Sequence, residues 1–452
     1  MLFTADFIKE CFSDCDGMYD PSKEIEHVFT DSREEKANSL FIPLVGDKFD
    51  GHTFLSAAIS SGAVATLWQK DKPKPENIPN DFLFFYVEDT LKALQQLAKA
   101  YRTLVNPTVI GITGSNGKTT TKDLCHTVLQ QSYRTHATVG NFNNHIGLPL
   151  TILQMPRNTE MLILEMGMNH FREIEQLTKI ACPDYAIITN IGESHIEYLG
   201  SRKGIAQAKL EITLGLKQEG LLIIDGDEPL LIEQIQDVQV ITCGFSDTND
   251  IKLRDVVIDI EKTIFKIGSN SRFSIPLAGS HHAKNASYVI ALARKLNMDD
   301  QTVQEGLLKL SHSAMRFEQI HGKNDALLIN DAYNASITST KAAIEVVKAL
   351  DGFKEKVLVL GDVLELGSYA KEMHCSIAES IDNNITHVYT YGHNAEEITN
   401  ILKKEEQHIS VAHFSNKLQL ENKLQKHLNS NTVILFKASR MMQFEQLVDA
   451  CK

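Results

Sequence analysis

A glycine-rich segment that contains one lysine has the clearest chemical meaning in this sequence. Residues 111–120 read Gly-Ile-Thr-Gly-Ser-Asn-Gly-Lys-Thr-Thr. Glycines let backbone N–H groups turn toward phosphate oxygens, Lys118 brings a positive charge to the β- and γ-phosphates of a nucleotide, and the Thr119 hydroxyl is a suitable magnesium ligand. Gly-x-x-Gly-Lys-Thr is complete, although Ile112 occupies the first glycine position of the longer Gly-x4-Gly-Lys pattern. We expect phosphate contacts from Gly114, Ser115, Asn116, Gly117, Lys118, Thr119 and Thr120.

The flanking residues predict the elements that hold this loop. The β-branched run at 108–113 is typical of a buried strand, and 121–131 has the pattern of a helix. A helix that starts directly after the loop would point the positive end of its dipole at the phosphates. An ordinary glycine turn is the alternative, and this strand–loop–helix order argues against it.

Two further polar residues follow apolar runs that predict strands. Glu165 ends the run 161–164, and His195 follows the run 186–191 after a short turn. Ligands of open α/β sheets gather beyond the carboxyl ends of the strands, so both side chains are expected to face the phosphate loop. A carboxylate and an imidazole are possible metal ligands, and we expect them to hold magnesium near the γ-phosphate. Either residue alone would more often be a solvated side chain.

Lys209 interrupts an apolar stripe. Ile205, Lys209, Ile212 and Leu216 recur at helical spacing on one face. Burial disfavours an ammonium group, so Lys209 must extend its amine to solvent, pair with a carboxylate, or become neutral. A neutral amine is able to add carbon dioxide, and the resulting carbamate would be an anionic metal ligand. The residues themselves slightly favour the extended amine and leave all three alternatives open.

The remaining pattern predicts an α/β fold with parallel sheets in about three domains. The chain has 452 residues, of which 43% are hydrophobic, enough for more than one core. Apolar strand patterns alternate with helical ones after Asn106-Pro107, interrupted by a more polar β-like stretch at 250–276 and followed by a helical pattern at 281–296. Three prolines in 71–79 predict a surface loop. We place the domains at 1–105, 106–312 and 313–452.

Composition excludes several classes of function. The formal charge is -13, from 45 basic and 58 acidic side chains, which opposes sequence-independent nucleic-acid binding. No apolar run is long enough to span a membrane, and the acidic start does not resemble a signal peptide, so we expect a cytoplasmic protein. The seven cysteines are scattered without zinc-site spacing and are expected to be reduced.

Several motifs, in their order along the chain, resemble the Mur ligase family. The central ones are 114–120, Gly140-Asn-Phe-Asn-Asn-His-Ile-Gly-Leu-Pro-Leu150, Leu164-Glu-Met-Gly167, Ser194-His-Ile-Glu197 and Ala208-Lys-Leu-Glu-Ile212. Others extend the resemblance over nearly the whole chain: Thr30-Asp-Ser-Arg33, Asp50-Gly-His52, Gly279-Ser-His-His-Ala-Lys-Asn285, Arg316-Phe-Glu318 and Asn330-Asp-Ala-Tyr-Asn-Ala335.

The resemblance implies a small N-terminal α/β domain for a UDP-sugar, a central P-loop ATPase-type parallel sheet, and a Rossmann-like C-terminal domain for an incoming amine. It implies Lys118, Glu165, His195 and Lys209 as catalytic residues. Thr119 and Glu165 would serve a first magnesium, and His195 with a carbamylated Lys209 a second. Further ATP contacts are implied for Asn285, Arg316, Asp331 and Asn334, and substrate contacts for Ser32, Arg33, Asn141, Asn144, Lys437, Ser439 and Arg440.

Within the family, the chain looks like the member that adds D-alanyl-D-alanine to UDP-N-acetylmuramoyl-tripeptide. The segments 330–335, Gly361-Asp-Val-Leu-Glu-Leu-Gly367 and Lys437-Ala-Ser-Arg440 carry this likeness, and the Asp-Asn-Pro-Arg motif of the third-residue-adding enzyme is absent from the sequence. ATP would activate the peptide carboxylate as an acyl phosphate, and the chain would act as a monomer. Met315 and Ala438 stand where the family usually has glycine.

Two other kinds of function remain as alternatives. One is a related ligase, either the third-residue-adding enzyme or one similar to folylpolyglutamate synthase. The other is a P-loop switch in which the nucleotide changes affinity for a partner. The sequence lacks the Asn-Lys-x-Asp motif that reads guanine, which argues against the second alternative.

Overall fold

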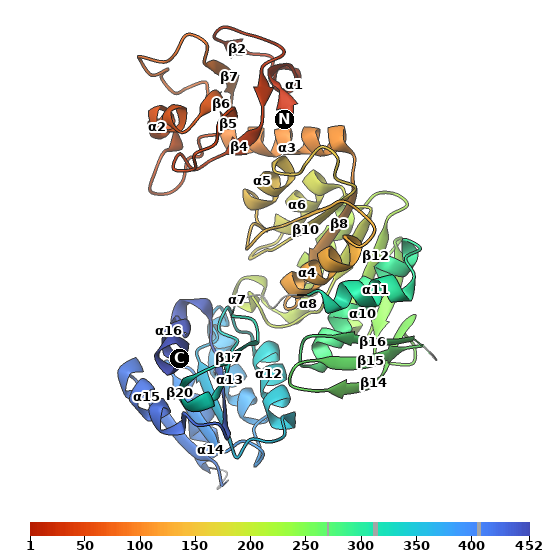
Figure 1. Ribbon diagram of the computed structural model, residues 1–452, viewed down its shortest axis with the longest axis vertical. Coiled ribbons are helices and arrows are strands. Elements are labelled where there is room, and N and C mark those ends of the chain that lie inside the picture. The colour runs from red at the N-terminus through yellow and green to blue at the C-terminus, as the bar shows by residue number, and fades with distance from the viewer. Residues whose placement is uncertain (269–270, 311–314, 405–407) are drawn as a thin grey trace.

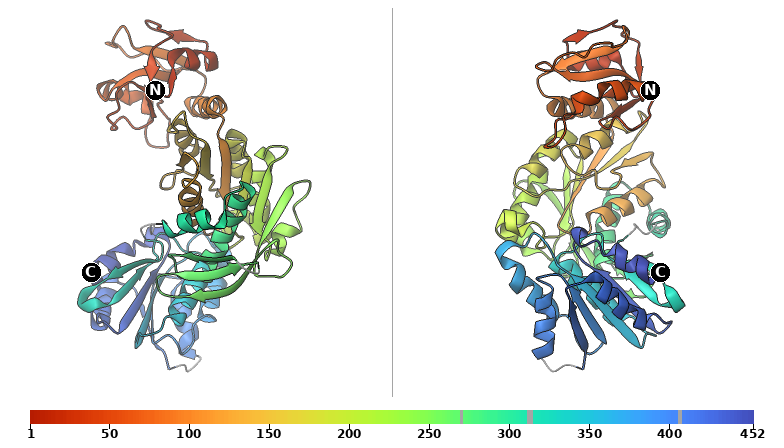
Figure 2. Two further views of the ribbon diagram at one scale, coloured as in Figure 1. Left: turned by 45° about the vertical axis from the view of Figure 1, so that its right-hand side comes forward. Right: turned by 90° about the vertical axis from the view of Figure 1, so that its left-hand side faces the viewer.

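Three main sheets follow one another along the long axis of the molecule (Figure 1). The computed structural model describes residues 1–268, 271–310, 315–404 and 408–452. Helices flank sheets that are largely parallel, so the predicted α/β class is confirmed. The two chain termini lie in the parts at opposite ends of the molecule (Figure 2). The predicted boundary between 312 and 313 lies outside the described residues.

The N-terminal part contains a five-stranded sheet in the order β2-β7-β6-β5-β4. Its strands are β2 (Cys15–Asp16), β4 (His27–Phe29), β5 (Ser39–Phe41), β6 (Ala63–Gln69) and β7 (Leu83–Val87), and a separate pair joins β1 (Phe3–Thr4) to β3 (Glu24–Ile25). The helices are α1 (Ala5–Cys11), α2 (Leu55–Ser60) and α3 (Thr90–Val105). Aromatic side chains such as Trp68 and Phe84 fill one face of the sheet. The proline-rich segment 71–79 lies in the loop between β6 and β7, as predicted.

Helix α3 connects this part to the next one. It packs against α5 (Gly147–Leu153), and the Tyr101 hydroxyl donates a hydrogen bond to the Met155 carbonyl at 2.7 Å. Asn106 ends the helix in the left-handed conformation, with φ of 50°. Proline cannot continue a helix from there, and β8 (Thr108–Thr113) begins one residue later.

The central sheet has nine strands in the order β16-β15-β14-β13-β12-β11-β8-β10-β9. The seven strands from β8 to β14 run parallel to one another. They are β8, β9 (Thr135–Ala137), β10 (Met161–Glu165), β11 (Tyr185–Ile188), β12 (Leu221–Asp225), β13 (Gln239–Gly244), β14 (Ile251–Ile258), β15 (Thr263–Ile267) and β16 (Ser271–Ile275). The flanking helices include α4 (Lys118–Leu129), α6 (Glu173–Ala181), α7 (Ile196–Leu199), α8 (Arg202–Leu210), α9 (Pro229–Ile232), α10 (Ser280–Lys295) and α11 (Asp300–Leu308). The polar stretch at 250–276 forms strands β14, β15 and β16, as its β-like pattern predicted. The structure adds that β14 pairs with β15, and β15 with β16, in antiparallel fashion.

The C-terminal sheet has the order β17-β18-β22-β19-β20-β21, with β17 antiparallel and the others parallel. Its strands are β17 (Glu318–His321), β18 (Leu327–Asn330), β19 (Glu355–Gly361), β20 (His387–Tyr391), β21 (Ser410–Phe414) and β22 (Thr432–Lys437). Its helices are α12 (Ile337–Ala349), α13 (Ala370–Ala378), α14 (Glu396–Lys404), α15 (Lys417–Leu424) and α16 (Glu445–Cys451). The runs 357–360 and 432–435 lie in β19 and β22, as predicted.

Two predicted helices have different bounds. Helix α4 begins at Lys118 rather than Thr121, because Gly117 adopts φ of 80° and serves as the N-cap. The helix through Lys209 was expected to continue to Leu216, but α8 ends at Leu210 and a 3-10 turn follows to Gly215. The expected stripe is nevertheless buried at Ile205, Lys209 and Ile212.

No helix within the described residues has the length and apolar character needed to cross a membrane. The seven cysteines, all within the described ranges, are free thiols.

Candidate active site

A cavity of about 650 Å³ lies between the central and C-terminal sheets. The carboxyl ends of β8, β10, β11, β18 and β22 meet around it. Its lining includes the predicted residues Ser115 to Thr120, Asn141, Asn144, Glu165, His195, Asn285, Arg316, Asp331, Asn334 and Lys437. Glu165 and His195 were selected from the sequence because they follow predicted strands, and both line this cavity.

The phosphate loop has a backbone that only its glycines accommodate. Gly114 adopts φ of 149°, and a Cβ there would lie 1.8 Å from Thr189 Oγ1. A Cβ on Gly117 would lie 2.7 Å from Asn285 Oδ1. The loop is thus pressed against the end of β11 on one side and against α10 on the other, and both glycines are required by close approach.

The end of β11 also holds the loop by hydrogen bonds. Asn190 accepts from the Asn116 amide at 3.0 Å through its side chain and from the Ser115 amide at 3.0 Å through its carbonyl. Thr189 Oγ1 and Asn190 Nδ2 both donate to the Asn116 carbonyl, at 2.6 and 3.0 Å. The loop conformation is therefore fixed by its own domain.

Several polar groups of the loop remain available to a ligand. Ser115 Oγ and Asn116 Nδ2 are buried without a hydrogen-bond partner among the described residues. Lys118 Nζ donates to the Gly114 and Ser115 carbonyls at 2.8 and 3.3 Å. Burial lowers the pKa of Lys118, although Glu165 acts in the opposite direction. Buried donors without acceptors are costly, and a phosphate would satisfy them.

Glu165 is buried beside the start of α4, with 3% of its surface exposed. Its Oε2 accepts a hydrogen bond from Thr119 Oγ1 at 2.8 Å, and its Oε1 accepts one from Asn143 Nδ2 at 2.8 Å. The two oxygens predicted as ligands of the first magnesium, from Thr119 and Glu165, are thus in direct contact. Asn143 was not predicted individually, although it lies within the motif at 140–150.

His195 lines the cavity and contacts the loop that follows β19 in the C-terminal sheet. Its Nδ1 is 2.6 Å from Glu365 Oε2, and this contact lowers the pKa of Glu365. Both residues adopt left-handed backbone conformations, with φ of 64° and 61°. The Glu197 amide also donates to the Glu365 carbonyl at 3.3 Å. The histidine therefore faces the cavity and bridges two domains.

Lys209 is buried, with 2% of its surface exposed, and is absent from the lining of the cavity. Burial moves its pKa well below the ordinary value, and the nearby charge of Lys118 acts in the same direction. No described residue pairs with its amine. Extension of this amine into solvent, the simplest of the three alternatives, is wrong for this structure; the neutral form is the one that burial favours.

The C-terminal residues predicted to contact ATP line the opposite wall of the cavity, together with Lys437, which was predicted to contact substrate. The Arg316 guanidinium lies 4.1 Å from the centre of the Tyr333 ring. Lys437 is buried and pairs with Asp331 Oδ2 at 2.7 Å, and it donates to the Asn334 carbonyl at 3.0 Å. The charged side chains of this wall are thus Arg316, Lys437 and Asp331.

Met315 and Ala438, which replace family glycines, have different consequences. Met315 keeps the left-handed conformation, with φ of 61°, that glycine adopts more readily. Ala438 is buried and does not have a positive φ. Only the first substitution therefore places a side chain on a strained backbone.

The remaining predicted substrate residues are divided between the cavity and its surroundings. Asn144 lines the cavity and caps α5 by accepting from the Gly147 amide at 2.8 Å. Ser439 and Arg440 do not line it: Ser439 Oγ accepts from the Leu364 amide at 2.9 Å, and Arg440 pairs with Glu445 at 3.0 Å. Ser32 and the exposed Arg33 lie between β4 and β5 in the N-terminal part and do not line the cavity.

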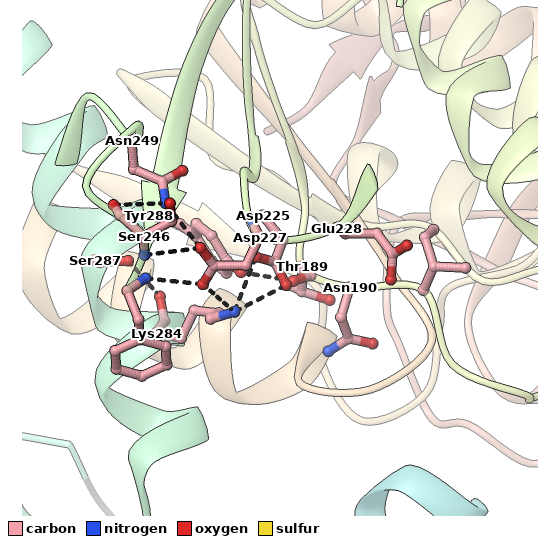
Figure 3. A network of polar contacts seen from close by, with 12 residues as sticks. Thr189, Asn190, Asp225, Asp227, Glu228, Ser246, Asn249, Lys284, Ser287 and Tyr288 are labelled. Atoms are coloured by element: carbon pink, nitrogen blue, oxygen red, sulfur yellow. Dashed lines mark hydrogen bonds and ion pairs between the residues drawn. The ribbon is translucent and has the colours of Figure 1, made fainter. Parts of the chain in front are cut away.

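A buried charge network at the far end of the cavity was missed. Lys284 lies between Asp225 and Asp227, at 2.9 Å from each carboxylate (Figure 3). Hydrogen bonds from the Phe245 and Ser246 amides and from Lys284 hold the pKa of Asp227 at about 2 despite its burial. Tyr288 Oη donates to the Thr189 carbonyl at 2.6 Å, which links this part of α10 to the strand that holds the phosphate loop. Asp225 ends β12, so the strand-end criterion could have found it.

Comparison with known proteins agrees with this architecture. The family described as Mur ligase middle domain matches residues 112–293, the Mur ligase, glutamate ligase domain matches 315–440, and the Mur ligase family, catalytic domain matches 24–102. The UDP-N-acetylmuramoyl-tripeptide--D-alanyl-D-alanine ligase of Bacillus subtilis is 47% identical over 94% of this chain and 92% of its own length.

Solved structures give the same result in three dimensions. A crystal structure of MurF from Acinetobacter baumannii has a TM-score of 0.85 at 28% identity and covers 99% of this chain and 98% of that one. The MurF ligase of Thermotoga maritima in complex with ADP has a TM-score of 0.81 at 28% identity, with coverage of 94% and 96%. The fold is that of a three-domain ligase. The chain belongs to the Mur ligase family and is an enzyme of the ligase class.

Proposed function

We propose that this protein joins D-alanyl-D-alanine to UDP-N-acetylmuramoyl-tripeptide with ATP as the energy source. One observation carries the reaction type: a phosphate loop with unpaired donors faces, across a single cavity, the cationic residues Arg316 and Lys437 of the C-terminal domain. The activity for which the Bacillus subtilis relative is named supports the choice of substrates.

The chemistry follows from the weakness of a carboxylate as an electrophile. The peptide carboxylate attacks the γ-phosphorus of ATP, ADP leaves, and an acyl phosphate forms. The amine of D-alanyl-D-alanine then attacks the acyl carbon, phosphate leaves, and the amide forms with release of a proton. Lys118 and the loop amides stabilise charge on the transferring phosphoryl group, so positioning and electrostatics provide most of the rate.

Thr119 and Glu165 are suited to hold magnesium beside the phosphates, with His195 near a second position. Their fit is supported by the contact between Thr119 Oγ1 and Glu165 Oε2 and by the burial of the carboxylate, which is a hard anionic ligand. A bound magnesium would neutralise charge on the phosphoryl oxygens. Asn143, on the other carboxylate oxygen, orients Glu165 for this role.

We further propose that Lys209 is carbamylated in the active enzyme. Its buried, neutral amine attacks carbon dioxide, a C–N bond forms, and one proton is released. The product is an anion that the positive charge of Lys118 attracts, whereas the same charge opposes a protonated amine at Lys209. This anion and His195 would serve the second magnesium.

We assign 1–105 to the UDP-sugar peptide, 106–312 to ATP and 313–452 to the amine. We also propose that the enzyme acts as a monomer.

Substrate choice is tested with purified protein and ATP by product mass and phosphate release. UDP-N-acetylmuramoyl-tripeptide with D-alanyl-D-alanine should yield the pentapeptide. The comparison arms are UDP-N-acetylmuramoyl-dipeptide with lysine or diaminopimelate, and folate with glutamate. Faster turnover in either comparison arm, with no pentapeptide formed, would replace our proposal by the corresponding ligase. Binding of nucleotide without turnover in all arms would favour a switch.

A further inference from the structure

A second group of possible metal ligands lies outside the cavity, in the C-terminal sheet. Glu355, His387 and His427 each offer one ligand atom, and these three atoms lie within 4.8 Å of one another. Glu355 is the first residue of β19, His387 is the first residue of β20, and His427 ends the 3-10 turn η5 (Gln425–His427). Three segments distant in sequence thus meet at the amino ends of adjacent strands.

This location separates the cluster from the candidate active site. The cavity lies at the carboxyl ends of the same sheet, where Lys437 ends β22. Strand β19 has seven residues, and at about 3.3 Å per residue it spans roughly 20 Å. Neither ATP nor the peptide substrates would therefore contact the cluster.

The hydrogen bonds of His427 fix the orientation of its ring. Its Nδ1 lies 2.8 Å from Glu355 Oε2, and its Nε2 lies 2.7 Å from the hydroxyl of Tyr389. A histidine that ligates a metal through one nitrogen usually has the other held by a polar group, which fixes the orientation of the ring. His427 is buried, with 6% of its surface exposed, and Tyr389 is in the position of that holding group.

His387 is the more accessible histidine of the pair. Its Nδ1 contacts Thr386 Oγ1 at 2.9 Å, which leaves Nε2 for a ligand. The His387 and His427 ring centres are 4.4 Å apart, with the planes inclined at 61°. The two rings are therefore in edge-to-face contact, and one nitrogen of each lies within 4.8 Å of the other and of a Glu355 oxygen.

We propose that Glu355, His387 and His427 bind a zinc ion, with Tyr389 as an outer hydrogen-bonding partner. Two imidazoles and one carboxylate suit zinc, whereas magnesium prefers oxygen ligands. Tetrahedral zinc with bonds of about 2.1 Å places its ligand atoms about 3.4 Å apart. The His427–Glu355 contact must open slightly and the widest separation must close, which the partly exposed Glu355 and His387 side chains allow by rotation.

The surrounding charge is mixed. Lys423 lies 5.7 Å from the centre of the Tyr389 ring and opposes a cation at His387. The Glu355 carboxylate offsets it at shorter range. Bound zinc would connect β19, β20 and the turn before β22, and so it would stabilise the C-terminal sheet without taking part in the reaction.

Calorimetric titration of the full-length protein tests this site. The protein is first freed of metal with a chelator, and zinc chloride is then added in the presence of excess magnesium chloride, which occupies the oxygen-rich sites. Wild type should bind zinc with a saturable isotherm. Glu355→Gln and His387→Ala should each weaken zinc binding by at least about tenfold, since even the loss of an outer partner costs about 10- to 100-fold. His321→Ala, at an exposed position of β17, is the matched control and should bind as wild type does.

A variant that keeps all three ligands distinguishes binding from misfolding. Tyr389→Phe retains the buried ring and removes only the hydroxyl, so it should fold and yet bind zinc about tenfold more weakly. Cobalt chloride should give intense visible absorption bands with wild type, and these should be lost in His387→Ala. Wild-type zinc affinity in His387→Ala, or no saturable zinc binding by wild type, would overturn the proposal.

Discussion

The two walls of the cavity are held in different ways. On the central side, Thr189 and Asn190 hold the phosphate loop through hydrogen bonds within one domain. On the C-terminal side, several side chains contact the central domain, and three of these contacts involve a residue that lines the cavity. These are Ser336 Oγ to Asn116 Oδ1 at 3.0 Å, Thr338 Oγ1 to Glu193 Oε2 at 2.7 Å, and His195 Nδ1 to Glu365 Oε2 at 2.6 Å.

This difference indicates that the two walls serve different steps of the reaction. Phosphate binding should depend on groups that are already in place, because the loop does not need the C-terminal domain to keep its shape. Attack by the amine should depend on the domain contact, because that contact positions the second wall. Variants on the two walls should therefore fail at different steps.

The largest effect is expected for Lys118→Ala. This variant removes the cation that stabilises the transferring phosphoryl group, and a loss of one such group reduces the rate by about a thousandfold. Phosphate release with saturating substrates measures it. Lys203→Ala, an exposed lysine of α8, is the control and should keep full activity. Activity of Lys118→Ala within a few fold of wild type would remove the phosphate loop from the mechanism.

Lys209→Ala should lower the ligation rate by about a hundredfold, in proportion to the loss of one electrostatic group in the site. The wild-type rate should also fall when carbon dioxide is removed from the buffers and return when bicarbonate is added. The variant should not respond to bicarbonate. A wild-type rate that is independent of bicarbonate would contradict the carbamate, and full activity of the variant would remove Lys209 from the site.

The central wall was predictable from the sequence to a larger extent than the C-terminal wall. Gly114, Lys118 and Glu165 stand beside apolar runs that predict parallel strands, and the ends of such strands meet at one edge. The position of Glu365 next to His195 depends on how two domains pack, and no local pattern contains that information. Lys284 was missed because a lysine in an amphipathic helix usually indicates a solvated face, whereas its two carboxylate partners come from the end of β12 and the turn after it.

His281 tests the contact of the two walls through pH. Burial, and secondly the charge of Lys437 on the opposite wall, lower the pKa of His281 to about 4 from an ordinary value of 6.5. Between these two pH values the unfolded chain binds more protons than the folded one, so the free energy of unfolding decreases as the pH falls from 6.5 toward 4. The contribution is up to about 3 kcal/mol.

Denaturant unfolding at several pH values measures this dependence. His281→Gln should flatten the curve between pH 4 and 6.5, whereas His321→Gln, at an exposed position, should leave it unchanged. An unaltered slope in His281→Gln would mean that the histidine is not held neutral at the contact of the walls.

The smallest effect is expected for Glu365→Gln, and it distinguishes the two walls most directly. The Glu365 side chain is 44% exposed, and partly exposed ion pairs contribute about 1 kcal/mol or less. The variant should therefore slow ligation by about threefold, because the C-terminal wall is held less often in place. Nucleotide affinity should change less than the ligation rate, since the phosphate loop is held by its own domain. Glu372→Gln, on the exposed face of α13, is the matched control for the ligation rate. If Glu365→Gln weakened nucleotide binding as strongly as it slowed ligation, the loop would depend on the domain contact, and the two walls would have to be treated as one unit.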